Sequence, residues 1–231
     1  MILYELCGSN GLRYSQFAWR TRMALAHKGL AVEYRGVRIS DKAAIAFSNQ
    51  DKVPILRDGE RVISDSWRIA EYLEQTYPNG PSLFGGAIGL ALARFINTWA
   101  DRQVIGAVAP VVACDLPACV DAEDGAHLQR VFEKAFGQTF EQMREERAVR
   151  LKQLRRTFDV PRASLKAQPF LSGAAPAYAD YILFSIFQWA RLVGTEDILT
   201  ADDPLTAWRE RMLDLFSGLA RSAPARIGAA G

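Results

Sequence analysis

Short apolar runs alternate with amphipathic stretches over the first third of the chain. Ile2–Leu6 is typical of a strand, and residues 16–29 place apolar side chains three to four positions apart, as a helix closed by a glycine does. Residues 32–39 predict a second strand. Two more short apolar runs flank Asp58-Gly59, which is a strong signal for a β-hairpin. The pattern therefore indicates an α/β arrangement.

One more helix is predicted after the hairpin. Asp65 or Ser64 is placed to cap it, its apolar positions share one face, and it must end before Pro78. The whole order, β-α-β-α-β-β-α, fits a three-layer α/β domain. We expect this domain to span residues 1–77.

A turn-rich segment at residues 78–87 then changes the pattern. It is rich in Pro and Gly, and strand-like alternation does not return after it. We therefore predict a linker at residues 78–87 and an all-helical domain over residues 88–231. Its Ala- and Gly-rich tail from Ser222 onward is expected to fray.

Four helical stretches are predicted in this second domain. Residues 90–114 are helical until Pro110 perturbs the pattern. Residues 178–193 are apolar almost all round, which is typical of a helix buried in the middle of a bundle, and residues 204–219 close the bundle. Residues 126–156 form one long amphipathic stretch, whose apolar side consists of Leu128, Phe132, Phe136, Phe140 and Met143.

The composition excludes several classes of protein. The 231 residues include 28 Lys and Arg against 26 Asp and Glu, and this net charge of +2 gives no pull towards nucleic acid or an anionic membrane. No apolar run approaches the ~20 residues of a membrane span, and Glu5 interrupts the first apolar stretch. We therefore expect a cytoplasmic protein with neither a membrane nor a nucleic acid as partner.

A run of basic residues in the second domain does not change this expectation. Glu145 and Glu146 interrupt the run, and no aromatic residue interleaves it, so we predict a solvated helix face. The run consists of Arg144, Arg147, Arg150, Lys152, Arg155 and Arg156.

Cysteine and histidine numbers argue against two other kinds of site. Cys7, Cys114 and Cys119 are odd in number and form no Cys-x-x-Cys pair, so a disulfide framework is not expected. His27 and His127 are far apart, and no His and Cys cluster has the spacing of metal ligands. We therefore predict no metal site and no Ser-His-Asp hydrolase.

Several motifs resemble the glutathione transferases in order and spacing. They are Lys52-Val53-Pro54-Ile55-Leu56, Asp58-Gly59, Ile63-Ser64-Asp65-Ser66, Ile69-Ala70-Glu71-Tyr72-Leu73, Tyr77-Pro78 and Ala179-Asp180. The resemblance covers nearly the whole chain. A second set most resembles the bacterial β-etherase and related fungal-type branch, and it consists of residues 15–22, Ala26-His27-Lys28-Gly29, Asp65-Ser66-Trp67, Asp202-Asp203-Pro204-Leu205 and Trp208.

This resemblance implies a glutathione S-transferase of the fold class α/β plus all-α. An N-terminal thioredoxin-like domain would hold glutathione, and a C-terminal helical bundle domain would hold a hydrophobic, aromatic electrophile. The resemblance further implies glutathione as co-substrate, a homodimer and a role in detoxification. The branch adds the cleavage of a β-aryl ether as a narrower activity.

The Val53-Pro54 motif predicts one part of the glutathione site. A cis bond there would leave the Val53 N–H and C=O facing outward, where extended glutathione could pair with them. A trans proline that starts an edge strand is the alternative. Lys52 is expected to bind the glycine carboxylate, with Lys42 or Gln50 as alternatives.

Asp65 and Ser66 predict the other part, because they lie at the start of a helix. Free N–H groups and the positive end of the helix dipole favour a carboxylate, to which the Ser66 hydroxyl could donate. Asp65 could accept from the α-amino group of the ligand. A helix cap without a ligand is the alternative.

Catalysis needs the glutathione thiol as a thiolate, against a free thiol pKa of about 8.5. Ser15 lies at the expected start of the first helix, where its hydroxyl could donate to the sulfur while the helix end adds positive potential. Tyr14, Ser9 and Tyr4 are alternative hydroxyl donors. Gln16 stands where a proline is usual in the branch, so this loop departs from the pattern.

Two other classes of function stay open. A cysteine-type glutathione oxidoreductase would use Cys7, for which we expect a buried and inert thiol instead. A non-catalytic glutathione- or ligand-binding protein of the same fold would keep Val53, Asp65 and Ser66 but would not stabilise the thiolate.

The second domain offers fewer candidates. The resemblance implies that the first long helix of this domain lines the electrophile pocket. On this helix, Trp99 and Val108 are the residues expected to contact the electrophile. Phe187 and Trp189 are predicted to be core.

Asp180 resembles the helix-capping aspartate of the family and is expected to stabilise the fold. Ala177 stands where Ser, Thr or Asn is usual, so we expect the capping box to be incomplete.

Overall fold

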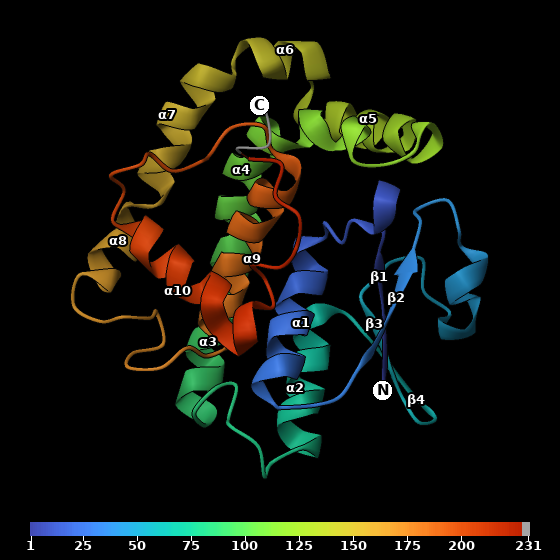
Figure 1. The fold of residues 1–231 in the computed structure, drawn as a ribbon, viewed down its shortest axis with the longest axis vertical. Helices are drawn as coiled ribbons and strands as arrows, with labels where there is room; N and C mark the ends of the chain where they lie inside the picture. Colours follow the sequence, from blue (N-terminus) through green and yellow to red (C-terminus); the bar gives the residue numbers. More distant parts are fainter. Residues whose placement is uncertain (228–231) are drawn as a thin grey trace.

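A four-stranded mixed sheet forms the centre of the N-terminal domain in the computed structural model, which describes residues 1–227 (Figure 1). The strand order is β2-β1-β3-β4, with β1 parallel to β2 and the other two pairs antiparallel. The strands are β1 (Ile2–Leu6), β2 (Glu33–Val37), β3 (Ile55–Asp58) and β4 (Arg61–Ser64). Gly59, at a φ of +57°, turns the chain from β3 into β4, so the predicted hairpin is confirmed.

Helices cover both faces of this sheet. The α-helices α1 (Gln16–His27) and α2 (Ser66–Thr76) lie on one face, and the 3-10 segment η2 (Ala43–Ser48) lies on the other (Figure 1). Alternate strand residues divide between the two faces: Leu3 belongs to the main core cluster, whereas Tyr4 packs with Ile45 of η2. The predicted three layers are present, with the middle helix shortened to a 3-10 segment. A shorter 3-10 turn, η1 (Ser9–Gly11), precedes α1.

The C-terminal domain is built from helices. They are α3 (Ala87–Trp99), the π-helical turn η3 (Ala100–Val104), α4 (Ile105–Val112), the 3-10 segment η4 (Ala113–Ala118), α5 (Ala122–Phe136), α6 (Phe140–Glu145), α7 (Arg147–Thr157), α8 (Asp159–Leu165), α9 (Tyr178–Val193) and α10 (Leu205–Gly218). Helix α9 has the predicted bounds, and all its side chains except Ala179 and Arg191 are buried. It packs against α1 as well as against α3 and α4, so it joins the two domains.

Two helices expected from the sequence are divided. The prediction of one helix over residues 126–156 was wrong, because Gly137 ends α5 in the left-handed conformation at a φ of +66° and Thr139 then caps α6. The stretch over residues 90–114 is helical as expected, but a π-helical turn interrupts it and α4 ends two residues after Pro110.

The prediction that the basic run is a solvated helix face was wrong at Arg147. Arg147 is only 8% exposed, and its guanidinium lies 2.7 Å from a carboxylate oxygen of Asp115. Asp115 also accepts hydrogen bonds from the backbone and the hydroxyl of Thr195, both at 3.1 Å. One position of the run therefore ties α7 to the interior.

The segment after α10 is tied to α9. The Arg226 amide donates to the carbonyl oxygen of Arg191 at 3.1 Å, and the Arg191 guanidinium donates to the carbonyl oxygen of Ala223 at 3.0 Å. The expected fraying from Ser222 is therefore wrong as far as Ile227, and residues 228–231 lie outside the described residues. Within residues 1–227, no helix has both the length and the apolar character needed to cross a membrane.

Candidate functional site

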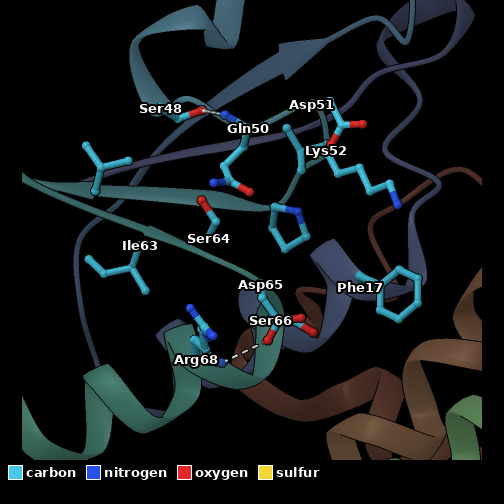
Figure 2. Close-up of a pocket in the computed structure, with 13 residues that line it drawn as sticks. Phe17, Ser48, Gln50, Asp51, Lys52, Ile63, Ser64, Asp65, Ser66 and Arg68 are labelled. Carbon is cyan, nitrogen blue, oxygen red and sulfur yellow. Dashed lines mark hydrogen bonds between the residues drawn. The ribbon is translucent and has the colours of Figure 1, made fainter.

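A polar cavity of about 880 Å³ opens between the start of α2 and the loop before β3. Figure 2 shows Asp65 and Ser66 on one side of this cavity, with Gln50, Asp51 and Lys52 on the facing side. The cavity therefore has the N-terminus of α2 on one side and the amino group of Lys52 on the other.

Asp65 caps α2 from a backbone conformation with a positive φ, +79°. Its Oδ1 accepts hydrogen bonds from the amides of Trp67 at 3.0 Å and Arg68 at 3.1 Å. Because both bonds go to Oδ1, Oδ2 can accept from a cationic group in the cavity. Ser66 is the first residue of α2, so its hydroxyl lies where the helix dipole favours an anion.

The Val53–Pro54 peptide bond is cis, and both residues line the polar cavity. β3 begins only at Ile55, which pairs with Tyr4 and Ser64. The backbone of Val53 therefore lies outside the paired part of the sheet, where an extended peptide can add to it.

An apolar cavity of about 480 Å³ adjoins the polar one. The two share Phe17, Asp51, Lys52 and Val53 as lining residues. A ligand in the polar cavity can therefore present a reactive group to a hydrophobic molecule in the second cavity. The apolar lining of the second cavity comes from both domains and includes Leu6, Val37, Ile45, Leu116, Leu128, Phe132 and Trp189.

Ser15 lies in the lining of the apolar cavity and is the N-cap of α1. Its side chain is 4% exposed, and its Oγ accepts from the Ala18 amide at 3.4 Å. Because Oγ is the acceptor in that bond, its own proton can be donated to an anion in the cavity. The positive end of the α1 dipole acts in the same direction.

Of the residues named as alternative hydroxyl donors, Tyr14 is the one that also lines this cavity. Its hydroxyl is buried without a hydrogen-bond partner among the described residues. Burial raises the pKa of Tyr14, so the hydroxyl stays protonated and able to donate. Ser9 lines a different, smaller cavity, and Tyr4 packs against Phe47 on the other face of the sheet.

The structure brings most of the other candidates to the two cavities. Lys52 lines both, and Gln50 lines the polar one. Lys42 lines the apolar cavity and donates from Nζ to the carbonyl oxygen of Asp51 at 2.7 Å. Cys7 is half-buried, so the prediction of a buried thiol was wrong, and it lines neither cavity.

The two residues predicted to contact the electrophile, Trp99 and Val108, do not line either cavity. Val108 is fully buried in the interior, and Trp99 lines neither cavity. Helix α5 supplies the wall instead. Its Asp124 accepts from the amides of Ile39 and Ser40, both at 2.9 Å, and this holds α5 beside the loop after β2.

Sequence reasoning did not assign the cavity wall to Leu128, Phe132 and Trp189. The signal was present, since the stripe on residues 126–156 contains Leu128 and Phe132. A helical stripe of apolar side chains has the same pattern whether it covers a core or lines a cavity, and Trp189, at 2% exposure, does both.

No metal site is found within residues 1–227, where no three His, Cys, Asp or Glu side chains are grouped so that they could hold an ion.

Comparisons with known proteins point to one family. The chain matches the family model of the glutathione S-transferase C-terminal domain over residues 91–216 and that of the N-terminal domain over residues 10–82. It is 30% identical over 105 residues to a probable glutathione S-transferase of Glycine max. It is 31% identical over 99 residues to a maleylacetoacetate isomerase of Dictyostelium discoideum.

These matches to curated relatives are partial. They cover 44% and 40% of this chain, and the chain spans a little under half of each relative, 47% and 43%. Among solved structures, a glutathione S-transferase of Ceriporiopsis subvermispora in complex with glutathione has a similar fold, with a TM-score of 0.80 and 23% identity. That likeness covers 93% of this chain and 95% of the other.

Proposed function

The chain belongs to the glutathione S-transferase family, and on this basis we propose that it is a glutathione transferase in which Ser15 stabilises the thiolate of bound glutathione. The polar cavity holds the tripeptide, and the apolar cavity holds a hydrophobic, aromatic electrophile. The observation that carries the proposal is that the two cavities share Phe17, Lys52 and Val53 while Ser15 lies in the apolar one.

The polar cavity offers a partner for each charged group of glutathione. The γ-glutamyl carboxylate binds at Ser66 and the α2 N-terminus, and its α-ammonium binds Asp65. The peptide backbone of glutathione pairs with Val53 beside Pro54, as an added strand does. Lys52 binds the glycine carboxylate at the other end of the cavity.

The thiol then points to Ser15. Its hydroxyl donates to the sulfur, and the α1 dipole contributes roughly 0.3–2 kcal/mol. At about 1.36 kcal/mol per pKa unit this lowers a thiol pKa of about 8.5 by about one unit, so a large fraction is thiolate near neutral pH. The thiolate attacks the electrophilic carbon, a C–S bond forms, and the leaving group departs with the electron pair of its own bond.

A β-aryl ether is the narrower substrate that we propose, because residues 15–22 resemble the β-etherase branch. The thiolate would displace an aryl oxide from a carbon beside a ketone, and the aryl oxide would take up a proton as it leaves. Glutathione-dependent release of a phenol from such a ketone tests this step. Conjugation of a chlorodinitrobenzene without any phenol release would exclude the cleavage of a β-aryl ether. The proposal would then be general transferase activity, with a role in detoxification.

We also place a second copy of the chain on α3, as a homodimer. Ile88, Leu92 and Phe95 are spaced for one face of α3 and are 80%, 63% and 68% exposed. Phe95→Asp should yield monomers in light scattering, whereas Val131→Asp, at another exposed apolar position, should not.

We propose the cytoplasm as the place of action. Cys7, Cys114 and Cys119 are all free thiols, as is usual for proteins of that reducing compartment.

Calorimetric titration of glutathione tests the central proposal. Glutathione should bind the wild type, and Ser66→Ala should weaken binding by about 1–3 kcal/mol, the usual effect when a charged group loses a hydrogen bond. Ser164→Ala, on the exposed side of α8, is the control and should bind as the wild type does. No binding to the wild type at millimolar glutathione would contradict the proposal and favour a fold that has lost this chemistry.

A further inference from the structure

One hydrogen bond crosses from the helical domain to the start of α2. The hydroxyl of Tyr178, the first residue of α9, donates to the backbone carbonyl oxygen of Ser66 at 2.8 Å, although 112 positions separate the two residues. Tyr178 is fully buried. Its partner Ser66 is the first residue of α2 and lines the polar cavity. The hydrogen bond therefore holds a part of the backbone that forms the cavity wall.

The start of α2 needs such an external contact. Asp65 holds a φ of +79° and a ψ of 129°, a positive-φ conformation that is costly for a residue with a Cβ and persists only where the surroundings impose it. The bonds from Trp67 and Arg68 to Asp65 lie within the same helical turn, so they shape the turn without fixing its position. The Tyr178 bond fixes that turn relative to the other domain.

The beginning of α9 is itself a fixed point. The Tyr178 amide donates to the carbonyl oxygen of Leu83 in the linker at 2.9 Å. Two residues later, the buried Asp180 carboxylate accepts from the Leu171 amide at 2.7 Å and from the Trp208 indole at 3.1 Å. The start of α9 is therefore held by several hydrogen bonds, and the Tyr178 hydroxyl connects it to the start of α2.

The Tyr178 side chain is suited to a permanent donor. Burial raises its pKa, so the hydroxyl stays protonated. Its ring packs edge-on to Trp67, with centroids 5.8 Å apart, and to Phe84, with centroids 5.4 Å apart. A phenylalanine in its place would keep both ring contacts and remove only the hydrogen bond.

We propose that Tyr178 is a positioning residue for glutathione: through the Ser66 carbonyl, it holds the α2 N-terminus in the geometry that binds the γ-glutamyl group. This inference rests on the proposed function. It assigns part of the glutathione affinity to a residue of the helical domain that lines neither cavity.

The test compares Tyr178→Phe with Tyr181→Phe. Tyr181 is the matched control, because it is equally buried on α9 and its hydroxyl also makes a hydrogen bond to the other domain, 2.6 Å from His27 Nδ1. The dissociation constant and KM for glutathione should rise about three- to tenfold in Tyr178→Phe, the usual effect of one lost hydrogen bond, and stay as in the wild type in Tyr181→Phe. The KM for a chlorodinitrobenzene should not change in either variant.

Amide hydrogen exchange without glutathione gives a second measurement. Exchange at Trp67 and Arg68 should be faster in Tyr178→Phe than in Tyr181→Phe. Equal glutathione affinity or equal exchange in the two variants would overturn the positioning role while leaving the proposed function intact. Failure of the wild type to bind glutathione would overturn the proposed function and, with it, the role of Tyr178.

Discussion

Nδ1 of His27 lies 2.6 Å from the hydroxyl oxygen of Tyr181, across the boundary between the two domains. The other ring nitrogen, Nε2, lies 3.1 Å from the carbonyl oxygen of Ser82, in the segment between α2 and α3. A carbonyl oxygen only accepts, so Nε2 carries the proton and Nδ1 accepts from Tyr181. Neutral His27 therefore connects α1 to α9 and to the segment between α2 and α3.

This arrangement makes the stability depend on pH. Burial lowers the pKa of His27, and Lys28 adds to the effect, while the bond to Ser82 and the charge of Glu74 oppose it. The unfolded chain then takes up the proton first as the pH falls. The stability contributed by neutral His27 is thus fully present above the unfolded pKa of about 6.5 and is lost as the pH falls through the lower folded value.

We expect the melting temperature of the wild type to fall between pH 7 and pH 5 more steeply than that of His27→Asn, in which this titration is removed. His127→Asn is the matched control, because His127 is exposed on α5, and it should keep the wild-type slope. Equal slopes for the wild type and His27→Asn would show that the His27 contacts do not respond to pH.

The hydroxyl that stabilises the thiolate can be identified by ultraviolet absorbance. Ser15→Ala removes the hydroxyl donor and leaves the α1 dipole in place. Because a hydrogen bond to a charged group contributes about 1.5–3 kcal/mol, the variant should raise the pKa of the bound glutathione thiol by about one unit or more, and turnover near neutral pH should fall about tenfold with the thiolate fraction. Tyr14→Phe should leave the pKa of the bound thiol unchanged, although Tyr14 lines the same cavity. The opposite result in the two variants would assign the role to Tyr14.

Asp180 accepts more hydrogen bonds than a helix cap requires. Its carboxylate accepts from the amides of Leu171, Ser172 and Ala177 and from the Trp208 indole, so the buried cap is satisfied although Ala177 has no side-chain acceptor. Asp180→Ala should lower the free energy of unfolding by about 3 kcal/mol, because several buried donors lose their acceptor. Chemical denaturation measures this, and an unchanged midpoint would contradict it.

Two arginines of one basic run should respond differently to truncation. Arg147→Ala leaves the nearly buried Asp115 without its guanidinium partner and should lower the free energy of unfolding by about 3–5 kcal/mol. Arg156→Ala, at an exposed position of α7, should change it by less than about 0.5 kcal/mol. Similar values for both would mean that the Arg147 pair contributes little.

Local sequence determined the elements and their ends. Asp58-Gly59 formed the hairpin, Ser15 and Asp65 capped α1 and α2, and the apolar pattern predicted the bounds of α9. Each of these features depends on hydrogen bonds or side-chain periodicity within a few residues, so neighbours in the chain are sufficient to specify it.

Only the tertiary structure decided which surfaces meet. Docking of α5 beside the loop after β2 turned Leu128 and Phe132 into a cavity wall, and the packing of α7 against α4 buried Arg147. The bond between Tyr178 and Ser66 likewise exists only because the two domains are docked against each other. An apolar stripe, a basic run or a tyrosine has the same local pattern in either setting, because burial depends on distant parts of the chain that sequence spacing does not encode.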